Sequence, residues 1–76
     1  MYSLKSLGVF EIKDRGTCFV VECPVTAPRN HAALKAALGG QVEIDGIVYD
    51  PIGFDLHMPA TPVHVGERIG ILVKPR

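Results

Sequence analysis

Apolar and polar residues alternate with a period of two along much of the chain, a pattern typical of β-strands with one buried face. The clearest example lies within residues 63–74, where Ile69, Ile71 and Val73 share one face of a predicted strand. Gly70 leaves a gap on the opposite face, and a glycine inside a strand often marks a tight bend or a close backbone approach. We therefore expect this last strand to curve around its neighbours, as strands do in a small closed barrel.

The first part of the chain predicts a β-hairpin. Residues 7–13 form its first strand, with Phe10 and Ile12 on the inner face. Residues 14–16 form the connection, where Gly16 can take the positive φ that such turns require. Residues 17–23 are rich in β-branched and aromatic side chains and form the return strand, which Pro24 ends because it has no N–H to donate.

Residues 28–38 change to a helical period. Four alanines and the pair Leu34 and Leu38 favour a helix, with Thr26 or Ala27 at its cap and Pro28 at or near its first position. The glycines that follow, at 39 and 40, predict its end. The two leucines lie on one stripe, which we expect to cover an open end of the barrel as a lid.

Short strands follow the helix. Residues 41–44 and 47–49 flank Asp45-Gly46, a pair that favours a two-residue type I′ turn. Ile52, Phe54 and Leu56 then resume an inward alternation. With the last strand this makes about six strands. The predicted fold is mainly β: a single domain, residues 1–76, forming a small six-stranded closed β-barrel with one α-helix inserted between strands 2 and 3.

The charge balance narrows the classes of partner. Eight basic and eight acidic residues give a formal net charge of zero, and the two signs are mixed along the chain. The chain therefore lacks the run of basic residues that usually supports generic binding to nucleic acid or to a membrane surface. A charge near zero gives little protection against self-association, so a dimer is compatible with this composition. The chain has no signal-peptide pattern and no apolar run of about 20 residues, so we expect a cytoplasmic protein without a membrane span.

The residue types that carry chemistry form no recognised pattern. Cys18 and Cys23 are five residues apart in one predicted strand, so they should point to opposite faces and form no disulfide with each other. The three histidines lack metal-ligand spacing. Asp50 and Asp55 could converge as an acid–base pair only through the bend at Pro51. We therefore expect no catalytic residue, no metal and no cofactor, and a small Cys/His/Asp enzyme or metal protein is the least favoured hypothesis.

Three glycine-containing motifs follow one another along the chain. The first combines FEI and RGT within residues 10–17, the second is GQVEIDG at 40–46 and the third is VGERIGILV at 65–73. Together they make residues 7–74 resemble the second, β-barrel domain of elongation factor Tu-like translation GTPases, here as a stand-alone domain. The resemblance implies the six-stranded barrel and a role in docking or in holding a tRNA end. The chain departs from it in two ways. Residues 28–38 replace a short turn of that family with a helix, and no G-x-x-x-x-G-K-[ST] loop is present to bind a nucleotide.

Two functions from different classes remain as expectations. The first is a non-enzymatic docking module that binds a protein partner or a second copy of itself. Its candidate contact residues are Arg15 at the hairpin turn and the apolar loop that contains His57, Met58, Val63 and His64. That loop could equally pack against the barrel. The alternative, which the resemblance implies, is recognition of RNA, although most of the aromatic residues fall at predicted core positions.

Overall fold

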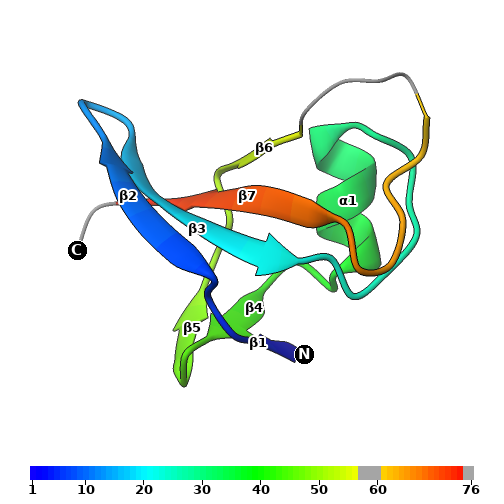
Figure 1. Ribbon diagram of the computed structural model, residues 1–76, viewed down its shortest axis with the longest axis horizontal. Coiled ribbons are helices and arrows are strands. Elements are labelled where there is room, and N and C mark those ends of the chain that lie inside the picture. Colours follow the sequence, from blue (N-terminus) through cyan, green and yellow to red (C-terminus); the bar gives the residue numbers. More distant parts are fainter. Residues whose placement is uncertain (57–60, 75–76) are drawn as a thin grey trace.

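The computed structural model describes residues 1–56 and 61–74 of the 76-residue chain. Within them the chain forms seven strands and one helix (Figure 1). In chain order these are β1 (Tyr2–Leu4), β2 (Gly8–Ile12), β3 (Gly16–Glu22), α1 (His31–Ala37), β4 (Val42–Ile44), β5 (Ile47–Tyr49), β6 (Gly53–Asp55) and β7 (Arg68–Val73).

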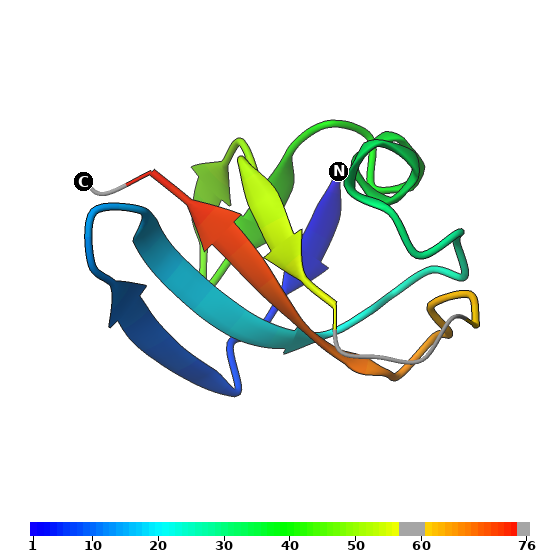
Figure 2. The ribbon, with the colours of Figure 1, turned by 90° about the horizontal axis from the view of Figure 1, so that it is seen from above.

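The strands form two sheets that enclose one core. In the three-stranded sheet β4 lies between β1, which is parallel to it, and β5, which is antiparallel. The other sheet has the order β2-β3-β7-β6, with every pair antiparallel. Figures 1 and 2 both show α1 at the end of the molecule where β3 finishes and β7 begins. The core therefore lies between the sheets, with the helix beside one end.

The mainly β class and the helix between the hairpin and the next strand are confirmed, but the closed six-stranded barrel is wrong. The described residues form seven strands in two open sheets. β1 was missed because three residues are too short to show an alternation, and its pairing with β4 joins segments 40 residues apart. Four of the strands have only three residues each. Strands this short offer few backbone groups for the hydrogen bonds that would join the edges of the two sheets into a closed barrel.

Several local predictions hold because neighbouring residues decide them. Asp45 and Gly46 have φ angles of 53° and 86°, both positive as a type I′ turn requires. Gly39 and Gly40, at 87° and 88°, follow the helix and end it as predicted. The predicted cap is wrong, because Asn30 takes that place: its side chain accepts a hydrogen bond of 2.8 Å from the Ala33 N–H.

The core draws on both sheets, the helix and two loops. Ile69, Ile71 and Val73 face it from β7, as predicted, and Leu34 and Leu38 are also fully buried in it. The helical stripe thus covers apolar surface as a lid would, although at the end of two open sheets. Phe54 is buried as predicted, whereas Ile52 is 47% exposed and does not face inward. The buried cluster as a whole comprises Val21, Cys23, Ala27, Leu34, Leu38, Val42, Ile44, Phe54, Val63, Ile69, Ile71 and Val73.

Candidate functional site

The four-stranded sheet has a second face, opposite the core, which we call the outer face. Its membership follows from the strand register, because residues paired across antiparallel strands share a face. Phe10 pairs with Cys18, and Cys18 pairs with Leu72. The outer face is apolar in the middle and charged around it: its residues include Phe10, Ile12, Cys18, Val20, Gly70 and Leu72, with Glu22, Asp55 and Arg68 beside them.

The prediction for β2 is therefore half correct. Phe10 and Ile12 share a face, but it is the outer face, and 47% of Phe10 is exposed. The reason lies in β3, where Phe19 and Val21 turn toward the core and so send the alternate residues Cys18 and Val20 to the other side. A period of two shows which residues share a face, but not which face is buried.

A hollow of about 380 Å³ lies on the outer face, lined by Phe10, Cys18, Val20, Asp55, Arg68, Ile69 and Gly70. Gly70 permits the close packing at this site. A Cβ added to it would lie 2.7 Å from Cys18 Sγ and 2.9 Å from Asp55 Cβ, closer than side chains approach one another. The close approach predicted from this glycine is confirmed. A second hollow of about 240 Å³ shares Cys18 and Asp55 and extends toward Ile12, Arg15 and Leu72.

Cys18 is a nucleophilic residue type that lines both hollows. Burial raises the pKa of the Cys18 thiol, and the nearby Asp55 carboxylate raises it further. Cys18 therefore stays protonated near neutral pH and is a poor nucleophile. Both cysteines are free, as predicted: Cys18 faces the hollows and Cys23 belongs to the core. Among the described residues, no three His, Cys, Asp or Glu side chains are grouped to hold a metal ion.

The structure separates the contact residues predicted from the sequence. Arg15 is exposed at the β2–β3 turn and lines the second hollow. Val63 is fully buried in the core, so it offers no surface to a partner in the folded chain. His64 is exposed in the loop before β7. Figures 1 and 2 both show that loop at the opposite end of the molecule from the β2–β3 turn. His57 and Met58 lie outside the described residues.

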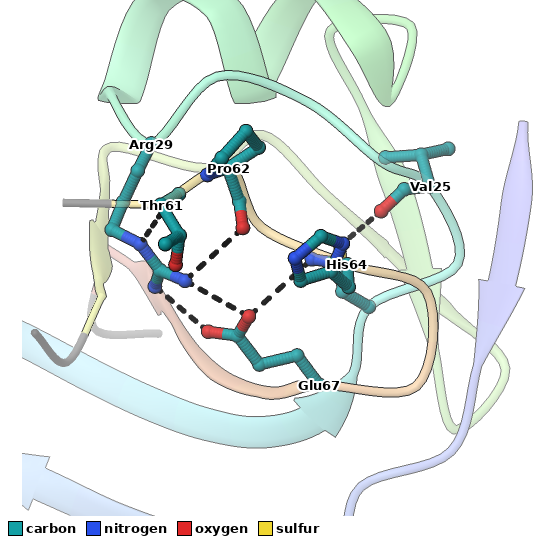
Figure 3. A network of polar contacts seen from close by, with 7 residues as sticks. Val25, Arg29, Thr61, Pro62, His64 and Glu67 are labelled. Atoms are coloured by element: carbon teal, nitrogen blue, oxygen red, sulfur yellow. Dashed lines mark hydrogen bonds and ion pairs between the residues drawn. The ribbon is translucent and has the colours of Figure 1, made fainter. Parts of the chain in front are cut away.

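An ion-pair network at the end near α1 was not predicted (Figure 3). Arg29 donates to both carboxylate oxygens of Glu67, over 2.7 Å and 2.9 Å, and its Nε donates to the Thr61 carbonyl over 2.7 Å. The side chains of Arg29 and Glu67 are 10% and 27% exposed. Nothing in the sequence indicates this pair, because its members are 38 residues apart on two loops.

The network joins the β3–α1 connection to the loop that leads into β7. Backbone hydrogen bonds between Ala27 and Val63, of 2.8 Å and 3.1 Å, join the same two loops. Both carboxylate oxygens of Glu67 accept hydrogen bonds from Arg29, so the two opposite charges are paired with each other within the fold. We interpret it as a structural contact that positions the start of β7, and hence Arg68 beside the larger hollow.

This ion pair should make stability depend on pH. The hydrogen bonds from Arg29 hold the pKa of Glu67 below its usual range. A carboxylate with a lowered folded-state pKa stabilises the fold above its unfolded pKa, and this contribution is lost as the pH falls through the folded pKa. In a double-mutant cycle of Arg29→Gln and Glu67→Gln, measured by urea denaturation, we expect a larger coupling at pH 7 than below about pH 4. An equal coupling at both pH values would contradict this interpretation.

Comparisons with known proteins find no match: no family model, no curated protein and no solved structure is similar enough to this chain to be reported. Among the described residues, no helix has the length and apolar content needed to cross a membrane.

Proposed function

We propose that the chain is a non-enzymatic docking module that binds another protein or a second copy of itself through β2 and the adjoining hollow. The observation that carries the proposal is the exposure of β2. Val9 is 58% exposed, Phe10 is 47% exposed, and Leu7, just before the strand, is 50% exposed. Three large apolar side chains within four residues are thus exposed, with Phe10 on the outer face and Val9, which pairs with Phe19, on the opposite face of the strand. Exposed apolar surface of this kind marks interaction sites.

The surroundings of Phe10 fit a protein interface. Phe10 borders a hollow whose other lining residues combine apolar groups with Arg68 and Asp55. An apolar centre with an aromatic residue and a charged border is the usual composition of such surfaces. The protonated Cys18 thiol adds volume to the hollow but little reactivity. These features support binding without chemical turnover.

A photo-crosslinking amino acid placed at position 10 tests the proposal in cells. We expect position 10 to form an adduct with a protein, because Phe10 is 47% exposed on the outer strand β2 and borders the larger hollow. The matched control is position 48, since Val48 is 49% exposed on β5, in the other sheet. Adducts at position 48 alone, or at neither position, would contradict the proposal.

Recognition of RNA is the second candidate, and one observation favours it: the exposed Phe10 ring and Arg68 line the same hollow. Single-stranded RNA binds to such combinations of an exposed ring and a positive charge. Asp55 in the hollow and Glu22, paired with Arg68, reduce the local positive charge and make protein docking the better-supported function. Binding of short single-stranded RNA that weakens with added salt and is lost in Phe10→Ala would reverse this order.

A further inference from the structure

We infer that the occupant of the exposed β2 surface is a second copy of this chain, joined by antiparallel pairing of β2 with β2 about a two-fold axis at Phe10. This inference rests on the proposed docking function and specifies its partner. Such a pairing would make one continuous sheet of the four-stranded sheets of two copies. It needs a strand with a free edge and a residue pattern that matches its own reverse.

β2 has the most suitable edge among the described strands. It is outermost in the order β2-β3-β7-β6, and Figures 1 and 2 both place it at the border of the molecule. It has five residues, whereas the other outer strands, β1, β5 and β6, have three each. An outer strand presents unpaired backbone N–H and C=O groups along its free edge, and β2 contains no proline to interrupt them.

The residue pattern favours one register. Residues that face each other across a two-fold antiparallel pair have numbers with a constant sum. An axis at Phe10 pairs all five residues of Gly8–Ile12, whereas an axis at Val9 or at Glu11 pairs three. The axis at Glu11 would also bring two carboxylates opposite each other, which is destabilising. The register centred on Phe10 thus uses the whole strand and places no like charges directly opposite.

The side chains in this register complement each other. Phe10 would face Phe10 of the second copy, an aromatic cross-strand pair of the stabilising kind. Gly8 would face Ile12, and the space above Gly8 is open, with nothing within 4 Å of an added Cβ. Glu11 is held toward β3, because its carboxylate accepts a hydrogen bond of 3.0 Å from the Thr17 hydroxyl. The acidic side chain is thereby drawn away from the free edge.

Sedimentation velocity on the purified chain tests the inference. We expect the mass to rise from 8.2 kDa toward twice that value with concentration, with a dissociation constant on the order of 100 µM, because the contact is at the small end of specific interfaces. Phe10→Lys and Phe10→Glu should each weaken self-association at least about tenfold, because each puts like charges face to face. A mixture of the two variants should associate again, because the lysine then faces the glutamate.

The matched control is Val48→Lys, which alters a similarly exposed residue of another outer strand and should leave self-association unchanged. A wild-type chain that stays monomeric at millimolar concentration, or a mixture of charge variants that fails to associate, would overturn the inference. The photo-crosslinking experiment separates this failure from failure of the proposed function. An adduct at position 10 with a different protein would keep the docking function and reject the second copy, whereas no adduct would reject both.

Discussion

Replacing Gly70 with valine is expected to destabilise the fold by about 3 kcal/mol or more, at the upper end of the cost of overpacking. The first added carbon would already lie 2.7 Å from Cys18 Sγ and 2.9 Å from Asp55 Cβ. The Asp55 atom is adjacent to the backbone of β6, so β6 and β7 would have to separate. A domain of this size has a total stability on the order of 5 kcal/mol, so we expect partial or complete unfolding at 37 °C, measured by urea denaturation followed by circular dichroism.

Gly8→Ala is the matched control for this prediction. Gly8 also lies in the four-stranded sheet, but nothing is within 4 Å of its added Cβ and its φ is not in the left-handed region. We expect a change within about 0.5 kcal/mol, measured at concentrations low enough to prevent self-association. Gly70→Ala should fall between the two variants. Equal stabilities for Gly8→Ala and Gly70→Ala would show that β6 and β7 do not approach each other as described.

Replacing Leu34 with alanine is expected to cost about 3 kcal/mol, the middle of the range for fully buried leucines. Leu34 has no exposed surface and is the buried residue of α1, which spans seven residues. A helix this short is not stable by itself in water, so its packing against the core sustains it. The loss should appear as a lower midpoint of urea denaturation and a lower melting temperature.

The same leucine-to-alanine change at Leu7 controls for side-chain chemistry. Leu7 is 50% exposed, so we expect Leu7→Ala to cost less than about 1 kcal/mol in the dilute monomer. If Leu34→Ala costs no more than Leu7→Ala, the helix does not cover the core in the way the structure shows.

The hollows on the outer face and the Arg29–Glu67 ion pair differ in how far the sequence indicates them. Gly70 inside an alternating strand predicted the close packing that underlies the larger hollow. Arg15, also proposed from the sequence, lines the neighbouring hollow. The Arg29–Glu67 pair had no such signal, because two charged residues 38 positions apart are brought together by the arrangement of the loops. The burial of Val63 could not be predicted either. A valine in a proline-rich loop gives the same sequence pattern whether its side chain is exposed or, as here, fully buried.

The sequence by itself determined the features that depend on neighbouring residues: the hairpins, the Asp45-Gly46 turn, the end of the helix at Gly39 and the shared face of Ile69 and Ile71. Only the tertiary structure decided that β1 pairs with β4, that the sheets stay open and that Phe10 faces outward. The physical reason is that backbone conformation and alternation are set over a few residues. The side of a strand that becomes buried is set by which distant segments pack against it.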